Sequence, residues 1–190
     1  MGQRVNLRVR YGVLGRLGHH LRMRIRPLTG ADSDALAETV RQGFDSFREW
    51  APPGWAPPPA PAEAERIREG LTRPSTWGLI AIEGGRVAGH VAFTQARERQ
   101  EPRPDIAGLA HVWQLFVRRD WWGTGIAAEL NRRAVAEAVA LGYEAMRLYT
   151  PHGNARGRAF YEREGWSTDG IRIPEPELGL DLVQYRRLLT

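Results

Sequence analysis

Residues 109–117, LAHVWQLFV, form a nearly continuous apolar run that leads through a short glycine segment into a helical pattern. Such a run is typical of a strand that is covered on both faces of a sheet. From Thr124 onward apolar residues recur at the spacing of one helix face, and Gly142 stands where a helix would stop. The predicted apolar stripe is Ile126, Leu130, Ala134, Ala138 and Leu141. This unit restricts the fold to packed layers of helices and strands.

The patterns on either side predict further strands and helices. Glu83-Gly84-Gly85 separates two apolar runs as a hairpin turn does, and prolines exclude regular structure until about Pro61. We expect strands at 23–28, 109–117, 144–150 and 180–189, a hairpin at 76–98, and helices at 32–44, 62–71, 124–141 and 154–164. This order predicts one mixed α/β (α+β) domain over residues 23–190.

The positive charge of the chain is concentrated at its start. Residues 1–22 hold five arginines and no acid, which accounts for the net charge of +5, because the rest balances 22 bases against 22 acids. We expect residues 1–22 to be a basic extension that is disordered or precedes a native start at Met23. A neutral domain argues against nucleic acid as a partner, although a tether in the extension stays an alternative.

The composition also excludes several kinds of chemistry. Cysteine is absent, so disulfides and thiolate nucleophiles are excluded. No histidine pair has the spacing of a zinc site, and we expect no metal. No apolar run approaches the roughly 20 residues of a membrane-spanning helix, so we expect a cytoplasmic protein without a membrane partner.

A glycine loop between a strand and a helix is suited to bind an anion, because free N–H groups lie at the positive end of the helix dipole. The P-loop signature is excluded, since the chain has no lysine. Gly123, Gly125 and Ala128 satisfy the dinucleotide pattern G-x-G-x-x-G/A. However, five residues separate the strand from the loop, and the nearby acid Glu144 lies at the wrong end of the next strand. NAD therefore stays a rival ligand.

A different frame, Trp122 to Ala127, resembles the acetyl-CoA loop Q/R-x-x-G-x-G/A of the GNAT superfamily of N-acetyltransferases, except that Trp122 replaces Gln or Arg. The block from Asn154 to Trp166 resembles the later N-x-x-A-x-x-F/L-Y-x-x-x-G-F block of that family, with one extra residue. The resemblance covers about Met23 to the end. It implies a mostly antiparallel sheet flanked by helices, with two splayed parallel central strands, and acetyl transfer from acetyl-CoA to a primary amine of a small molecule or peptide.

The same resemblance implies roles for particular residues. The backbone N–H of Val117 would hold the acetyl carbonyl, Asn154 would bond the pantetheine arm, and Tyr161 would donate a proton to the leaving sulfur. Asn154 and Tyr161 are also two helical turns apart and share one side of a helix, although a helix cap and a packed aromatic are alternative roles. The expected cofactor-binding residues are Leu115, Phe116, Val117, Trp122, Gly123, Thr124, Gly125, Ile126, Ala127, Asn154 and Arg158.

The residues that handle the amine are less defined. An aliphatic amine has a pKa of about 10.4 and needs to lose a proton. His111 occupies the strand position of a catalytic glutamate in histone-acetylating relatives, and either a base or a packed core residue fits it. His90 and His152 are weaker candidates. For the phosphate end of CoA, the candidate cations are Arg119, Arg156, Arg158 and Arg163.

The acceptor and the assembly stay open. Asp45, Glu49 and Glu63 are candidates for attracting a cationic amine, and the tryptophans at 50 and 55 suit either a stiff linker or a loop beside the substrate. The resemblance implies a monomer or a homodimer. The alternative function is a GNAT-like module that binds acyl-CoA without catalysis.

Overall fold

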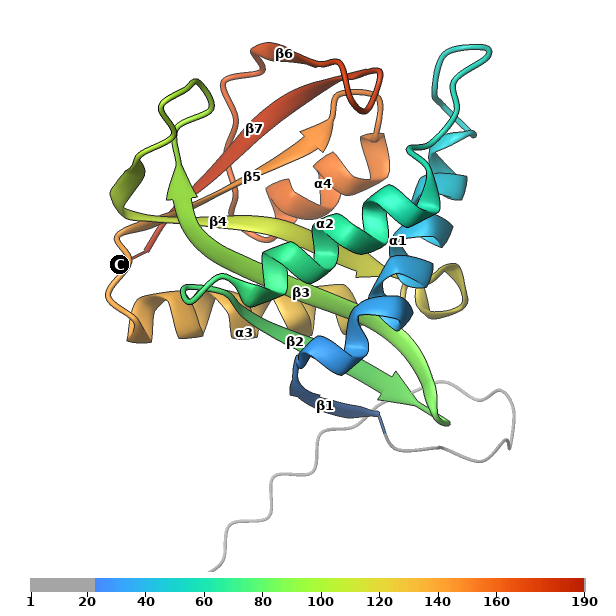
Figure 1. The fold of residues 1–190 in the computed structure, drawn as a ribbon, viewed down its shortest axis with the longest axis horizontal. Helices are drawn as coiled ribbons and strands as arrows, with labels where there is room; N and C mark the ends of the chain where they lie inside the picture. The colour runs from blue at the N-terminus through green and yellow to red at the C-terminus, as the bar shows by residue number, and fades with distance from the viewer. Residues whose placement is uncertain (1–22, 190) are drawn as a thin grey trace, which may run out of the picture.

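The computed structural model describes residues 23–189, and the interpretation of residues 1–22 lies outside this range. Its centre is a seven-stranded sheet in the order β1-β2-β3-β4-β5-β7-β6 (Figure 1). Every neighbouring pair is antiparallel except β4 and β5, which are parallel. The strands are β1 (Arg24–Pro27), β2 (Trp77–Glu83), β3 (Arg86–Arg97), β4 (Asp105–Val117), β5 (Ala145–Pro151), β6 (Arg172–Glu175) and β7 (Leu180–Leu188).

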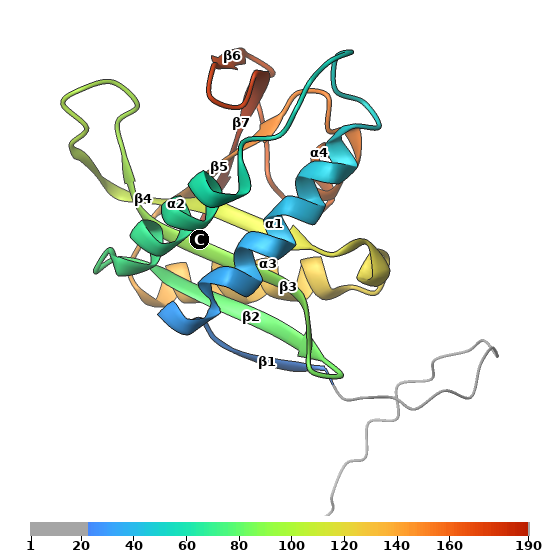
Figure 2. The ribbon, with the colours of Figure 1, turned by 45° about the vertical axis from the view of Figure 1, so that its right-hand side comes forward.

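Helices cover both faces of this sheet (Figure 2). They are α1 (Ser33–Phe47), α2 (Ala60–Thr72), α3 (Ile126–Ala140) and α4 (Ala155–Arg163), with short 3-10 turns at Gly30–Asp32 and Arg119–Trp121. The buried face of α3 packs on β2 to β5 in the larger apolar core, which Tyr161 of α4 also contacts. The faces of α1 and α2 form a second core on the other side of the sheet, together with Ile80 of β2. The sheet therefore lies between two layers of helices, as the sequence predicts.

The one parallel pair is only partly joined. β4 and β5 pair from Leu109 opposite Ala145 to Val112 opposite Leu148, and the register ends there although both strands continue. On its other edge β4 keeps its pairing with β3, with a register shift next to Trp113. The two central strands therefore separate beyond Val112 and leave a gap in the middle of the sheet.

Most of the predicted elements are confirmed. The apolar stripe of α3 is buried at Ile126, Leu130, Ala134 and Ala138, whereas Leu141 is wrong as a member, because it follows the helix and is 56% exposed. Strand β6 was not predicted. It has four residues, one of them a proline, and pairs only at the edge of the sheet, so it is too short to show the pattern of a longer strand.

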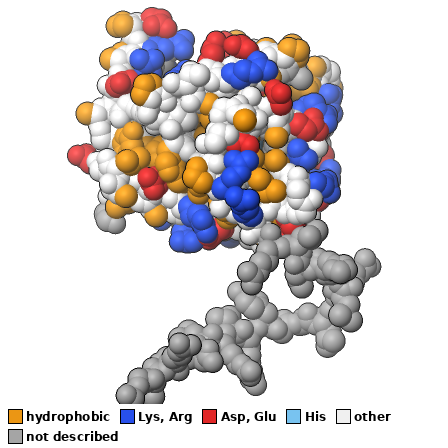
Figure 3. Space-filling view, turned by 60° about the horizontal axis from the view of Figure 1, so that its bottom comes forward, with side chains coloured by type: hydrophobic (Ala, Val, Ile, Leu, Met, Phe, Trp, Pro, Cys, Tyr) orange, Lys and Arg blue, Asp and Glu red, His pale blue; other side chains and the backbone are white. Residues whose placement is uncertain are grey.

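The surface agrees with a domain of balanced charge. Figure 3 shows basic and acidic side chains mixed over the face that it presents, with hydrophobic side chains between them. None of the helices within residues 23–189 combines the length and the apolar character needed to cross a membrane.

Candidate active site

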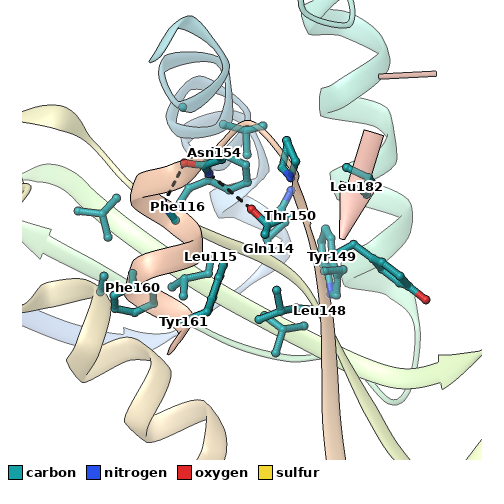
Figure 4. A pocket seen from close by; sticks show the side chains of 18 of the residues that line it. Gln114, Leu115, Phe116, Leu148, Tyr149, Thr150, Asn154, Phe160, Tyr161 and Leu182 are labelled. Carbon is teal, nitrogen blue, oxygen red and sulfur yellow. Dashed lines mark hydrogen bonds between the residues drawn. The ribbon is translucent and has the colours of Figure 1, made fainter. Parts of the chain in front are cut away.

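A cavity of about 1630 Å³ opens where β4 and β5 separate. Gln114 and Leu115 line it from β4, and Leu148 and Thr150 line it from β5 (Figure 4). Residues of α1, α2, α4 and the glycine loop complete its walls. The gap in the sheet is therefore continuous with the loop that the sequence singles out.

One edge of β4 presents its backbone groups to this cavity. The N–H of Arg118 donates to the carbonyl of Ala88, on the β3 side, at 2.9 Å. Because neighbouring residues of a strand direct their backbone groups to opposite edges, the N–H and C=O of Val117 and Leu115 point toward the gap. An extended ligand chain can therefore bond to this edge as an added strand would.

The glycine loop has room for a ligand close to its backbone. Gly123 and Gly125 have φ angles of +77° and +90°, which favour glycine, and a Cβ at either position would meet nothing within 4 Å. Gly125 is the N-cap of α3, so the N–H groups of the first turn have no partner within the helix. Thr124 is exposed and outside the cavity lining, and its hydroxyl donates to the carbonyl of Trp121 at 2.7 Å. The loop is open, positively polarised and suited to a phosphate.

Trp122, which departs from the family pattern, fastens the loop to the end of β4. Its indole N–H donates to the carbonyl of Val117 at 2.8 Å. The guanidinium of Arg156 lies 4.2 Å from the centre of its ring, and that of Arg119 lies 5.4 Å away. Trp122 therefore joins strand, loop and two cations at one rim of the cavity.

The two predicted residues of α4 both line the cavity. The side chain of Asn154 caps the helix, because its oxygen accepts from the N–H of Gly157 at 2.9 Å, and its amide nitrogen lies 3.5 Å from the hydroxyl of Thr150 (Figure 4). Tyr161 lies between the larger core and the cavity wall. Burial raises the pKa of its phenol above the ordinary value. Tyr161 therefore stays protonated at neutral pH and can donate a hydrogen bond.

Of the candidate cations, the structure brings Arg156 and not Arg158 to the cavity. Arg158 is outside the cavity lining, since its guanidinium turns toward the hydroxyl of Tyr185 and the carbonyl of His152, each at 3.3 Å. Arg119 and Arg163 also line the cavity, although Arg119 already pairs with Glu49 at 2.8 Å. The periodicity of α4 could not show this difference, which depends on where β7 lies.

The two strand histidines have different surroundings. His111 is half-buried in the cavity wall, and its Nδ1 lies 3.4 Å from the carbonyl of Arg147. Burial, together with the positive charge of Arg147, lowers its pKa to about 4. His90 is fully buried, and burial lowers its pKa to about 4 as well. Both imidazoles are therefore neutral at pH 7.

Three polar side chains, one each from β3, β4 and α2, are connected beside the cavity. His90 Nε2 lies 3.0 Å from the side-chain oxygen of Gln114, whose amide nitrogen lies 3.5 Å from a carboxylate oxygen of Glu63. Glu63, on α2, is only 6% exposed and also pairs with Arg66. The sequence made Glu63 a candidate for attracting a cationic amine but could not show that it is buried against Gln114.

The proline-rich segment contributes to the site. Trp50 lines the cavity and packs on Phe47, with ring centres 4.8 Å apart. Trp55 is held outside the cavity lining by a hydrogen bond from its indole to the carbonyl of Leu178 at 2.8 Å. The segment is therefore a wall of the site at Trp50 and a fixed connection at Trp55. Within residues 23–189 no cluster of three or more histidine or acidic side chains is placed to hold a metal ion.

The depressed pKa of His90 makes stability depend on pH. The unfolded chain takes up a proton near pH 6.5 and the folded chain only near pH 4, so stability is full above pH 6.5 and falls as the pH drops toward 4. The loss is on the order of 3 kcal/mol, since one pKa unit corresponds to about 1.4 kcal/mol. Urea unfolding between pH 4 and 7 should show a smaller pH dependence in His90→Gln than in the wild type. An unchanged slope in His90→Gln would contradict this account.

Comparison with known proteins finds a family match and similar folds. Residues 41–166 match the acetyltransferase (GNAT) family. An uncharacterized N-acetyltransferase of Mycobacterium tuberculosis (strain H37Rv) is 26% identical over 147 residues, which cover 74% of this chain and 86% of the relative.

Solved structures share the fold. A GNAT acetyltransferase of Staphylococcus aureus has a TM-score of 0.68 at 15% identity and covers 89% of this chain and all of its own. The PaiA N-acetyltransferase of Thermoplasma acidophilum, in complex with coenzyme A, has a TM-score of 0.62 at 17% identity and covers 88% of this chain and 99% of its own. With the family match extending over most of the chain, the protein belongs to the GNAT acetyltransferase family.

Proposed function

We infer that this protein is an acetyl-CoA-dependent N-acetyltransferase that acts on a primary amine of a small molecule or peptide by direct attack in a ternary complex. The observation that carries this inference is the junction of two features in one cavity. The exposed backbone edge of β4, at Leu115 and Val117, leads directly to the open glycine loop at the start of α3. A ligand with an extended amide chain and a pyrophosphate matches both features.

The residues present fit coenzyme A. The N–H groups after Gly125 would hold the pyrophosphate, and the edge of β4 would bond the pantetheine amides. Arg156, stacked on Trp122 at the rim, is better placed than Arg158 for a phosphate of the nucleotide end. Asn154 lines the same cavity and has one amide hydrogen for the arm. When bound, acetyl-CoA supplies an acetyl thioester, which is open to attack by an amine.

The reaction needs a hydrogen bond at the acetyl oxygen and a proton at the leaving sulfur. The N–H of Val117 is directed to the gap and would serve the oxygen, and its position is fixed because Trp122 holds the carbonyl of the same residue. Tyr161 would donate its phenolic proton to the leaving sulfur and would regain a proton from the water that takes up the proton of the amine. Since the chain has no cysteine, it has no thiolate to carry the acetyl group, which favours direct transfer between the two bound reactants.

The amine must arrive at this point without its extra proton. His111 is neutral at pH 7 and can accept a hydrogen bond from the amine, although a pKa of about 4 makes it a weak base. Water in the cavity would then take up the proton. His111 is therefore proposed as an acceptor that orients the amine and passes its proton to solvent.

Ligand binding tests the proposal against the dinucleotide alternative. Coenzyme A at about 100 times its Kd should raise the melting temperature by roughly 5–10 °C, because binding at that ratio stabilises the fold by about 2.7 kcal/mol. NADH at the same concentration should leave the melting temperature unchanged. A shift with NADH and none with coenzyme A would overturn the assignment of the loop.

A further inference from the structure

The wall of the cavity next to His111 is unusually rich in arginine. His111 and Arg147 face each other across β4 and β5. Their strand neighbours Val112 and Leu148 belong to the core under α3, so the side chains of His111 and Arg147 point to the opposite face of the sheet. Both residues line the cavity.

Arg147 is a buried cation without an acidic partner in the described part of the chain. Its exposure is 9%, and its guanidinium donates to the carbonyl of Arg97. Its Nε is buried and has no hydrogen-bond partner within residues 23–189. A buried cation left in this state is unfavourable unless an anion compensates it. Within the described residues, no oxyanion of the protein therefore compensates the charge of Arg147.

Two further guanidiniums lie close by. Arg99 and Arg147 both approach the ring of Tyr149, at 4.9 Å and 5.6 Å from its centre. Burial lowers the pKa of His111, and the positive charges of Arg147, Arg99 and Arg73 lower it further. The three arginines therefore all lie near the His111 imidazole. Glu175 neutralises only Arg99, at 3.1 Å.

The acids of α1, α2 and the neighbouring loops are already paired or exposed. Glu63 pairs with Arg66, and Glu49 pairs with Arg119. Asp45 is on the exposed side of α1, pairs with Arg41 and does not line the cavity. Glu98 and Glu177 line the cavity but are exposed, so water screens them. Asp45, Glu49 and Glu63 therefore do not make the cavity attractive to a polycation.

From this arrangement we propose that the acceptor amine carries an oxyanion, a carboxylate or phosphonate, on the same small molecule, and that Arg147 binds it. The proposal rests on the acetyltransferase function inferred above. The guanidinium of Arg147 would take the oxyanion, with Arg99 and Arg73 adding attraction, while the amine reaches the gap beside neutral His111. Amino acids and their phosphonate analogues have this form, whereas polyamines and aminoglycosides lack the anion.

Matched acceptors test the proposal on the wild-type enzyme. Thiol release from acetyl-CoA would be measured with L-phenylalanine, its phosphonate analogue and phenethylamine, with the same comparison for L-methionine, and with spermidine as a polycation. The anionic members of each set should have a kcat/KM at least about ten times that of the neutral amine. Equal or higher kcat/KM for the neutral amines or spermidine would overturn the proposal while leaving the acetyltransferase function intact. Absence of turnover with every amine, together with no binding of coenzyme A, would instead reject the underlying function.

Substitution of Arg147 tests whether this residue binds the oxyanion of the acceptor. Arg147→Gln should lower kcat/KM for the anionic acceptors about 10- to 100-fold, mainly through KM, and change that for phenethylamine less than about 3-fold. The KM for acetyl-CoA should not change. Arg147→Lys keeps a charge and should restore part of the preference, and Arg133→Gln, an exposed arginine of α3 that pairs with Glu129 outside the cavity lining, should behave as the wild type. An equal loss on anionic and neutral acceptors in Arg147→Gln would contradict the role of Arg147.

Discussion

Gly125→Val should abolish the stabilisation by coenzyme A and lower kcat/KM for acetyl-CoA by about 100-fold or more. Gly125 has φ of +90° at the start of α3, and a Cβ there would enter open space, the space that the pyrophosphate would occupy. A branched side chain would block the approach of the ligand to the free N–H groups and would also favour a different backbone conformation. The measurements are calorimetric titration with coenzyme A and steady-state turnover.

The other end of the same helix provides a matched control. Gly142 has φ of +82° after the C-terminus of α3, and a Cβ there also meets nothing within 4 Å. Gly142→Val should therefore introduce a similar backbone strain, which lowers the free energy of unfolding by roughly 1–2 kcal/mol and with it the melting temperature. The affinity for coenzyme A should stay unchanged. Retained affinity in Gly125→Val, or an equal loss of affinity in both variants, would contradict the proposed phosphate site.

Tyr161→Phe should lower kcat by about 100-fold while the Kd for coenzyme A stays within about 2-fold of the wild type. Its phenol lines the cavity, and burial keeps it protonated. The substitution removes only the hydroxyl, so the packing of the ring on Trp166 and Tyr185 is kept. A positioned proton donor typically contributes on the order of 100-fold or more to a rate. Steady-state kinetics gives kcat and calorimetric titration gives the Kd for coenzyme A, so the two measurements separate catalysis from binding.

Tyr143→Phe is the control for this variant. Tyr143 is half-buried and packs on Phe93 outside the cavity, so loss of its hydroxyl should leave kcat unchanged. A normal kcat in Tyr161→Phe would assign Tyr161 a packing role and require another proton source. A weakened Kd with normal kcat would make it a binding residue instead.

The sequence predicts those parts of the fold that depend on local pattern. The run 109–117 and the helix after Thr124 were recognisable because burial dictates their composition and spacing. The glycine loop was recognisable because positive φ angles require glycine at Gly123 and Gly125. These features were sufficient to predict the layered fold and to single out the loop as a candidate site.

The remaining features depend on contacts between distant segments. The periodicity of α4 does not distinguish Arg156 from Arg158, because β7, through Tyr185, is what draws Arg158 away from the cavity. Whether Arg147 has an acidic partner depends on which distant segments approach its side of β5. The burial of Glu63 depends on the docking of α2 on β4. No single stretch of the chain contains this information.

Trp122 departs from the family pattern, and the structure shows which contacts it makes instead. In the sequence it stands where Gln or Arg is expected, without an evident role. In the structure it donates to the carbonyl of Val117 and supports Arg156, so it connects the strand that would hold the acetyl group to the loop that would hold the phosphate. The replacement keeps a hydrogen-bond donor at this position.

Transfer of a labelled acetyl group tests the central claim most directly. Acetyl-CoA that carries isotope in its acetyl group would be incubated with the protein and an amino-acid acceptor, and both thiol and acceptor would be followed, with no background because the chain has no cysteine. We predict one thiol released for each labelled acetyl group recovered on the acceptor nitrogen, with none retained on the protein. Tight binding of acetyl-CoA without transfer of label to any primary amine would contradict the account and identify the protein as a binding module.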